Sequence, residues 1–285
     1  MSTNAIEIKL PEPGRVGQAT AVEQSRAVAE VQAAVIVARQ FPRNTQAAIR
    51  HMEDTCRNKQ LALQAFYSFK RSGSNVTGPT IYLARELARI WGNIDVAVRE
   101  LRRDDEFGQS EMLAYAWDLE TNTRVSTGFI VPHFRDKSGG AERLTSMRDI
   151  YESNANNGAR RLRECVFAVL PKWFSDDAQS RCRATIEDGG GEPLAQRIAK
   201  TIAVYAKDYS VDEARLEAFL ERASAKWNEY DLGQLVIVGQ SLRRGERTVA
   251  EAFPIARVTA ADITTKPAAE WREEEPPEGV GIPRD

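Results

Sequence analysis

The sequence predicts an α+β fold, in which an antiparallel sheet of three to four strands packs on a long central helix and a small helical module follows. Three observations indicate this. Polar and apolar residues alternate in three successive runs, at 94–103, 112–119 and 124–133, as in half-buried strands. Apolar residues then recur at helical spacing from 149 to 169. Three glycines at 189–191 separate this β-β-β-α core from a second helical stretch.

The segments before the sheet are predicted to be mainly helical. We expect residues 1–25, which are mixed and polar, to form a flexible N-terminus. An Ala- and Val-rich helix follows at 27–41, and a second helix at 45–58 has Asn44 in position for its N-cap. The stretch 61–71 contains three aromatic residues, which favour a strand.

The helix that leads into the sheet is predicted to begin at Pro79, because the fixed φ of proline suits the first helical position. A short turn at 120–123 joins the second and third strands. The long central helix is predicted to begin near Ser146, with Asp149 as the partner in a capping box. It should end before Pro171, since a residue preceding proline disfavours the helical conformation.

The remaining segments complete the predicted organisation. A helix at about 173–185 closes a core domain of residues 26–188, and residues 189–193 form a glycine linker. Residues 194–255 have the apolar spacing of a small helical module. Residues 256–285 are predicted to be a disordered acidic tail, because six acidic residues face three basic ones from position 264 onward.

Composition narrows the class of protein. With 42% hydrophobic residues in 285, the chain can bury a sizeable core. It has no apolar run long enough for a membrane span and no apolar stretch typical of a signal peptide. Cys56, Cys165 and Cys182 lie far apart without a CxxC pair, so we expect buried thiols rather than zinc ligands or disulfides. These features favour the reducing cytoplasm and no contact with a membrane.

The sequence contains little material for catalysis. No Lys-Ser or Lys-Thr pair follows the glycines at 73–78, so a P-loop is excluded. Asp118 and Glu120 lie two residues apart on a strand and, with His133, could hold magnesium in a nuclease. The lysine that such sites usually carry is missing, and a structural histidine is the simpler interpretation. We therefore expect no enzyme activity and no required cofactor, with a Mg²⁺-dependent nuclease as the alternative.

The central helix carries the pattern of a binding surface. Its apolar stripe, predicted to pack on the sheet, consists of Tyr151, Ala155, Ala159, Leu162, Val166 and Val169. Asparagine and arginine side chains lie on both flanks of this stripe, and they suit phosphate oxygens. One flank holds Asn154, Asn157 and Arg161, and the other holds Asn156, Arg160 and Arg163. The alternative is a solvated helix face whose charge Glu152 and Glu164 compensate.

Further basic residues lie beside aromatic ones, as in Phe69-Lys70-Arg71, Phe134-Arg135 and Lys172-Trp173. Such interleaving is typical of single-stranded nucleic-acid sites, where bases stack on rings while cations follow the backbone. The predicted DNA-binding residues are Arg161, Arg160, Asn157, Arg163, Asn154, Arg148, Lys137, Arg135, Lys172, Lys70 and Arg71.

These stretches resemble the phage single-strand annealing proteins of the RecT/Redβ/Erf kind. The similarity covers roughly residues 32–184. Its most specific pieces are WDLETN at 117–122 and RDIYE at 148–152, followed by NGARR at 157–161. The resemblance implies a β-β-β-α annealing core, oligomeric rings or filaments, and ATP-independent annealing of complementary strands in phage homologous recombination. It also implies that DNA lies between the sheet and the central helix, which makes Arg161 the first choice and Arg160 the second.

The resemblance further implies where the protein acts and which partners it binds. We expect single-stranded DNA, annealed duplex and further copies of the chain as partners, in the cytoplasm of an infected bacterium. The C-terminal module and tail would be left free to recruit a phage exonuclease or the host single-strand-binding protein, so truncation after Asp188 should keep DNA binding. A third hypothesis is a phage interaction or regulatory protein that does not contact DNA.

Overall fold

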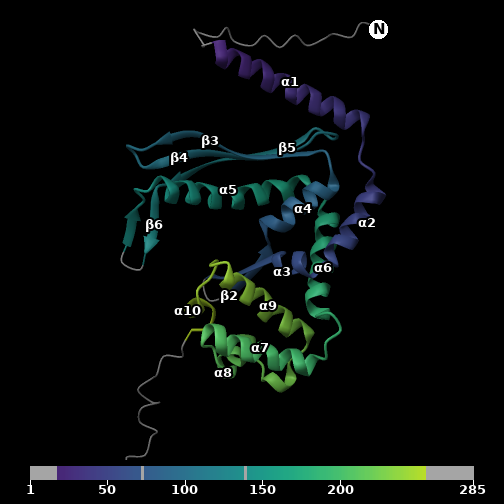
Figure 1. The fold of residues 1–285 in the computed structure, drawn as a ribbon, viewed down its shortest axis with the longest axis vertical. Coiled ribbons are helices and arrows are strands. Elements are labelled where there is room, and N and C mark those ends of the chain that lie inside the picture. The colour runs from purple at the N-terminus through teal and green to yellow at the C-terminus, as the bar shows by residue number, and fades with distance from the viewer. Residues whose placement is uncertain (1–17, 72–73, 138–139, 255–285) are drawn as a thin grey trace, which may run out of the picture.

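The computed structural model describes residues 18–71, 74–137 and 140–254 of the chain (Figure 1). Its α-helices are α1 (Gln18–Gln40), α2 (Thr45–Cys56), α3 (Lys59–Gln64), α4 (Ile81–Trp91), α5 (Met147–Val169), α6 (Lys172–Asp188), α7 (Leu194–Tyr209), α8 (Glu213–Leu220), α9 (Glu229–Arg243) and α10 (Val249–Ala252). Its strands are β1 (Phe66–Arg71), β2 (Ser74–Pro79), β3 (Ile94–Asp104), β4 (Gln109–Asp118), β5 (Thr123–Pro132), β6 (Phe134–Lys137) and β7 (Gly140–Arg143). Within these described ranges, no helix is both long and apolar enough to cross a membrane.

An antiparallel sheet in the order β3-β4-β5 covers one side of α5 (Figure 1). Val98, Ala114 and Thr127 are partners across its three strands. They face α5, where Cys165 Sγ donates to the Ala114 carbonyl oxygen at 3.7 Å. The strand pairs β1–β2 and β6–β7 form separate two-stranded ladders. The predicted mixture of helices and small antiparallel sheets is confirmed, and the three predicted strands coincide with β3, β4 and β5 within a few residues.

The face that α5 turns to the sheet differs from the prediction. Asn154 and Gly158 are buried there along with Ile150, Leu162, Cys165 and Val166. Tyr151, which the predicted stripe placed inside, is 69% exposed. The reason is close approach: a Cβ added to Gly158 would lie 2.6 Å from Val98 Cγ1. Apolar spacing alone could not predict which side of α5 faces the sheet, because a glycine and an asparagine occupy the centre of that side.

Replacing Gly158 with alanine is expected to lower the free energy of unfolding by about 1–3 kcal/mol, because the stiff Val98 side chain cannot move away without repacking. Alanine's better helix propensity, worth about 1 kcal/mol, offsets part of this cost. Urea unfolding of Gly158→Ala, Val98→Ala and the double variant measures the coupling. The double variant should lose less stability than the two single losses together; simple additivity would contradict this contact.

Several predicted boundaries in the N-terminal half require correction. Residues 18–25 belong to α1, so they are not part of a flexible N-terminus. Pro79 pairs with Phe66 at the end of β2 and does not start a helix. Thr80 is instead the N-cap of α4, and its Oγ1 accepts from the Leu83 N–H. The stretch 61–71 is divided between the end of α3 and the strand β1. The Asn44 cap is confirmed, since its side chain accepts from the Ala47 N–H at 2.9 Å.

The long helix begins and ends close to the predicted residues, but its capping box does not form. Ser146 is the N-cap of α5, and its side chain makes no capping hydrogen bond. The end at Val169, two residues before Pro171, agrees with the prediction. Helix α6 continues three residues beyond its predicted end, as far as Asp188.

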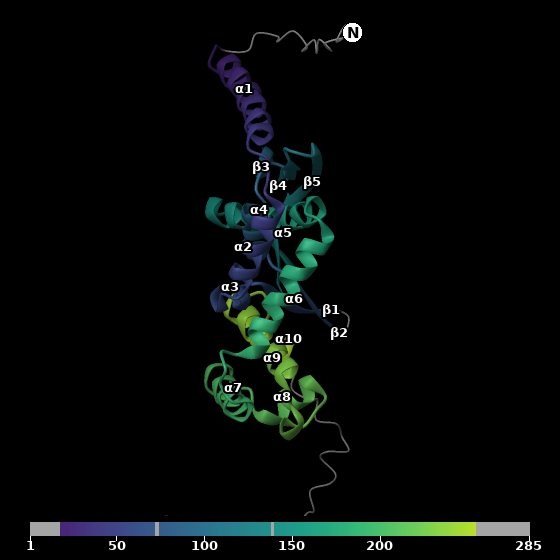
Figure 2. The same cartoon turned by 90° about the vertical axis from the view of Figure 1, so that its right-hand side faces the viewer.

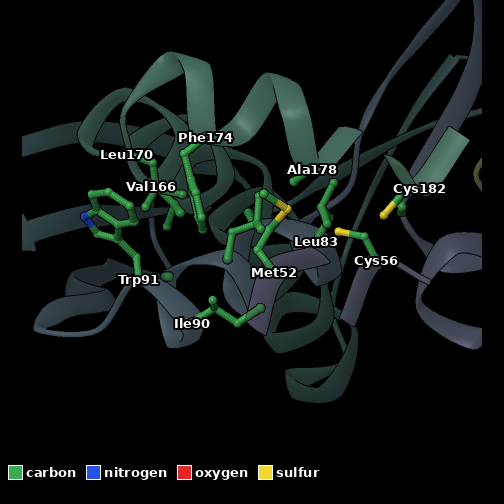
Figure 3. Packing of buried hydrophobic residues seen from close by; sticks show 14 of the residues in the cluster. Met52, Cys56, Leu83, Ile90, Trp91, Val166, Leu170, Phe174, Ala178 and Cys182 are labelled. Atoms are coloured by element: carbon green, nitrogen blue, oxygen red, sulfur yellow. The ribbon is translucent and has the colours of Figure 1, made fainter. Parts of the chain in front are cut away.

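The main hydrophobic core lies among α2, α4, α5 and α6 (Figure 3). Met52, Leu83, Val166 and Phe174 are fully buried in it. All three cysteines are free and buried, as predicted, and the sulfur atoms of Cys56 and Cys182 face each other within it (Figure 3). Their hydrogen bond lowers the pKa of Cys56 and, together with burial, raises that of Cys182. Both thiols are therefore core side chains.

The C-terminal module has a core of its own but is also attached to the rest of the chain. Tyr205, Leu216, Trp227 and Leu235 are among the buried residues of the second cluster. Ile237 of α9, however, belongs to the main core. Figure 2 shows α9 against α6, with α7 and α8 farther from the sheet. Helices α7 to α10 lie within residues 194–254, where the sequence predicts helices, and α9 packs on the main core although glycines precede the module.

The three glycines between α6 and α7 form a tight turn rather than a flexible linker. Gly189, Gly190 and Gly191 all have positive φ, at 62°, 81° and 78°. Arg197 packs so closely on Gly189 that an added Cβ would lie 2.3 Å from its guanidinium carbon. Its Nη2 donates to the Ile186 carbonyl oxygen at 3.2 Å. Glycine is used here for its left-handed conformation, which allows the module to turn back onto α6.

Candidate nucleic-acid interface

A cleft of about 820 Å³ lies on the side of α5 that faces away from the sheet. Its walls come from α5, β1, the start of α4, and the turn that follows α9. The lining residues are Tyr67, Ser68, Thr80, Ile81, Tyr82, Asn156, Ala159, Arg160, Arg163, Arg244, Gly245, Glu246 and Glu251. The segments that form these walls are far apart in the sequence. They meet here because α9 packs beside β1.

Two of the predicted DNA-binding arginines line this cleft. The Arg163 guanidinium lies over the Tyr67 ring, 4.6 Å from its centroid. Arg160 is exposed, one helical turn before it. Among the described residues, no carboxylate lies within ion-pair distance of Arg160 or Arg163. The two guanidinium groups therefore keep their hydrogen-bond donors available for an anion.

The opposite wall carries charge of both signs. Arg244 Nη2 donates to the Phe66 carbonyl oxygen at 2.7 Å, and its Nε pairs with Glu246 at 2.9 Å. Glu251 accepts a hydrogen bond from the Thr248 N–H, and this bond is the main reason that the pKa of Glu251 lies below its usual value. Arg244 thus links the C-terminal module to β1. Because Glu246 and Glu251 lie on this wall, the positive charge of the cleft lies on the α5 side.

The structure separates Arg161 from the cleft. Its guanidinium pairs with Glu164 at 3.1 Å, on another flank of α5. Asn157 Nδ2 donates to the Ser153 carbonyl oxygen, and Lys172 pairs with Asp176 at 2.6 Å. The predicted order, with Arg161 first, is therefore not what the geometry favours: Arg160 and Arg163 share the cleft with aromatic side chains.

Asn154 has a structural position and is removed from the predicted binding set. It is buried under the sheet, where its Nδ2 donates to Glu100 Oε2 at 3.0 Å and to Ser110 Oγ at 2.9 Å. Ser110 Oγ in turn lies 2.9 Å from His133 Nε2. This chain of polar groups joins α5, β3, β4 and the residue that follows β5. Buried polar groups need such partners, and the network accounts for His133 as a structural histidine.

The same network has the residue types of a serine hydrolase site, since Asp105 Oδ1 lies 4.0 Å from His133 Nδ1. A nucleophile must reach a substrate atom. Ser110 is 0% exposed and His133 only 2% exposed. The geometry therefore supports a buried structural network rather than a catalytic one.

The other predicted basic residues are not gathered in the cleft. Arg135 in β6 and Arg148 at the start of α5 are exposed. The predicted residues Lys70, Arg71 and Lys137 lie in strands, but their side chains are outside the described part of the structure. Tyr82, 49% exposed on the cleft wall, was missed because the sequence-based search took aromatic residues directly beside basic ones, and the neighbours of Tyr82 are Ile81 and Leu83.

His133 does not lie with Asp118 and Glu120, the two candidate carboxylate ligands, which both contact Arg43. Asp118 pairs with Thr123 at one end of the β4–β5 ladder, whereas Gln109 pairs with Pro132 at the other. His133 is therefore about 30 Å from Asp118, since nine strand steps rise roughly 3.3 Å each. Among the residues that the structure describes, no group of three or more His, Cys, Asp or Glu side chains is arranged to hold a metal ion.

Asp118 is instead the partner of Arg43, a residue that sequence reasoning missed. Arg43 Nη1 and Nη2 donate to the two carboxylate oxygens at 3.0 and 2.9 Å. The Arg43 guanidinium also lies 4.7 Å from the Trp91 ring centroid, and its Nε donates to the Trp91 carbonyl oxygen. Burial alone would raise the pKa of Asp118, but the Arg43 hydrogen bonds and charge outweigh it and hold the pKa below its usual value.

Comparison with protein-family models, curated proteins and solved structures gives no match for this chain.

Proposed function

We propose that this protein binds single-stranded DNA and anneals complementary strands without ATP, as in phage homologous recombination. The observation that carries the proposal is the pair Arg160 and Arg163, which lines a cleft together with Tyr67 and Tyr82. Arginine suits phosphate oxygens, and aromatic rings offer faces on which any base can stack. Contacts of these two kinds bind a strand without reading its sequence.

The resemblance to the annealing proteins implied DNA between the sheet and the central helix. In this chain that space is filled by buried side chains such as Leu162 and Cys165. We therefore place the strand on the other side of α5, in the cleft. One wall of the cleft comes from the C-terminal module, which then takes part in holding the strand.

Annealing requires no covalent step from the protein. Two strands repel through their phosphates, and neutralising part of one backbone reduces that repulsion. Base pairing then supplies the free energy of the product. Several copies of the chain along one strand would add their weak contacts through effective concentration. A homo-oligomer, acting in the cytoplasm of an infected bacterium and recruiting an exonuclease or a single-strand-binding protein, is part of this proposal.

Replacing both arginines with glutamine, Arg160→Gln with Arg163→Gln, is expected to weaken single-strand binding. Each lost phosphate contact lowers the log–log salt dependence of affinity by about 0.7, so the slope should fall by roughly 1.4. At about 0.15 M salt the same two contacts correspond to a roughly tenfold loss of affinity. Fluorescence anisotropy with a labelled oligonucleotide at several salt concentrations measures both quantities.

The control is Arg161→Gln, one residue away and paired with Glu164. It should leave the salt slope unchanged, and circular dichroism should show that all variants are folded. The single variant Arg160→Gln tests binding without disturbing the stacking of Arg163 on Tyr67. Loss of binding in Arg161→Gln alone would restore the sequence-based choice. Degradation of the oligonucleotide on addition of Mg²⁺ would instead support the nuclease alternative.

A further inference from the structure

Two tyrosines line the cleft, and their rings have different surroundings. Tyr67 in β1 is half-buried, and the Arg163 guanidinium lies over its ring. Tyr82, the second residue of α4, is 49% exposed. Among the described residues, no aromatic ring or cation is stacked on Tyr82. The two rings are therefore not equivalent as surfaces for a base.

The backbone is held on both sides of Tyr67. The Phe66 carbonyl oxygen accepts a hydrogen bond from Arg244 Nη2 at 2.7 Å, and the Ser68 N–H donates to Ser241 Oγ at 2.8 Å. The side chains of Phe66 and Ser68 are buried. Because successive side chains of a strand point to opposite faces, Tyr67 points the other way, to the cleft that it lines. Strand β1 thus presents its ring from a fixed position.

Gly78 gives the Tyr67 ring its place. The two residues lie opposite each other in the β1–β2 ladder. A Cβ added to Gly78 would lie 2.5 Å from Tyr67 Oη and 2.7 Å from its Cζ, closer than real Cβ contacts come. The phenol end of the ring therefore lies directly on the backbone of β2. Any side chain at position 78 would displace the ring.

The ring in turn orders Arg163. The guanidinium carbon is 4.6 Å from the ring centroid. A guanidinium is planar, so a group that stacks on an aromatic face keeps its N–H donors pointing sideways, available for phosphate oxygens. An arginine that is already ordered also loses less conformational entropy when it binds. For one long side chain this difference corresponds to roughly two- to tenfold in affinity.

We propose that Tyr67, placed on Gly78, is a positioning residue that orders Arg163 for phosphate, whereas Tyr82 is the ring on which a base stacks. The inference rests on the proposed function and deepens it, because it divides the cleft into a part that binds the backbone and a part that binds the base. Affinity then depends on the two tyrosines in different ways, which experiments can separate.

A double-mutant cycle tests whether Tyr67 acts through Arg163. Tyr67→Leu should weaken binding of a labelled oligonucleotide roughly two- to tenfold, and should add nothing in the Arg163→Gln background. Tyr67→Phe keeps the aromatic face and should recover most of the affinity. Tyr151→Leu, at an exposed ring of α5 outside the cleft lining, is the control and should bind like the parent. Additive losses for Tyr67→Leu and Arg163→Gln would mean that Tyr67 contacts the strand itself, which overturns the proposal.

Gly78→Ala changes the position of the ring without touching the cleft arginines. It should weaken binding as Tyr67→Leu does, because the added methyl group pushes the ring away. The matched control is Gly128→Ala in β5, where an added Cβ meets nothing within 4 Å. Circular dichroism shows whether both variants are folded. A folded Gly78→Ala protein with the affinity of the parent contradicts the role of Gly78.

An oligonucleotide without bases tests the role of Tyr82. Loss of one stacked base weakens binding about fivefold or more. Tyr82→Ala should show this loss with a normal oligonucleotide and none with an abasic one of the same length. Tyr67→Leu should weaken binding of both by the same factor, since its effect is on a phosphate contact. Equal losses of Tyr82→Ala with the two oligonucleotides would overturn the assignment of Tyr82.

Nuclear magnetic resonance of the protein without DNA separates this inference from the proposed function. The ring current of Tyr67 should shift the Arg163 Nε–H signal, which is assigned by its loss in Arg163→Gln. In Tyr67→Leu and Gly78→Ala the signal should move to the position of an exposed arginine. If it does so while the parent binds no oligonucleotide, the annealing proposal fails and the ordering of Arg163 stands. If the parent binds but the signal is the same in all three proteins, the proposed function stands and this inference is overturned.

Discussion

Replacing Arg43 with methionine is expected to lower the free energy of unfolding by about 3–5 kcal/mol, the usual cost of removing one partner of a buried ion pair. The side chains of Arg43 and Asp118 are only 8% and 5% exposed. Without Arg43, the Asp118 carboxylate is left buried with only the backbone N–H groups of Glu120 and Thr121. Urea unfolding measures the loss, and circular dichroism shows whether the variant is folded.

The matched control is Arg57→Met, which removes an exposed pair with Asp54. Exposed pairs contribute about 0–1 kcal/mol, so its effect should be small. Adding Asp118→Asn to Arg43→Met should recover part of the lost stability, because the buried charge is then absent. Equal losses for Arg43→Met and Arg57→Met would show that the buried pair does not stabilise the fold.

The pH dependence of this effect has a definite sign. In the folded protein the pKa of Asp118 is held below its usual value. The ion pair therefore contributes its stability above the unfolded pKa of roughly 3.9 and loses it as pH falls through the lower folded value. The difference in unfolding free energy between the parent and Arg43→Met should be constant near neutral pH and shrink below about pH 4. A difference that grows in acid would be inconsistent with this assignment.

The second large effect is expected from truncation after Asp188, which should abolish cooperative unfolding or lower its midpoint by many degrees. The truncation uncovers the surface on which Ile237 is buried, and loss of one such side chain alone costs about 2–5 kcal/mol. It also removes Ser241, whose Oγ accepts from the Ser68 N–H at 2.8 Å. Thermal unfolding followed by circular dichroism measures the change.

A chain that ends at Pro254 is the matched control, because it keeps the whole described module. It should unfold at the midpoint of the full chain. The sequence alone predicts the opposite result for truncation after Asp188, namely a core that keeps DNA binding. A truncated protein with the parent's midpoint and affinity would restore that expectation and remove the module from the cleft.

Local pattern was sufficient for the elements whose signal lies within a few residues. The alternation in β3, β4 and β5, the Asn44 cap and the end of α5 before Pro171 could all be predicted, because neighbouring side chains determine them. The wide spacing of the three cysteines argued against a zinc site and disulfides, and their residue type favoured the buried positions that they occupy. The pairs β1–β2 and β6–β7 were missed as ladders, since four to six residues carry too little alternation to be recognised.

Tertiary packing decided the rest. The side of α5 that faces the sheet is determined by contacts with distant residues. Gly158 packs against Val98, sixty residues earlier in the chain. Asn154 donates hydrogen bonds to Glu100 and Ser110. The Arg43–Asp118 pair joins residues 75 positions apart. The cleft exists because β1, α5 and the turn after α9 converge. The sequence of each of these segments does not indicate which other segments will pack beside it. Sequence could therefore place the arginines on the central helix, but only the packed fold decides which of them face a common space, because that choice depends on contacts between distant segments.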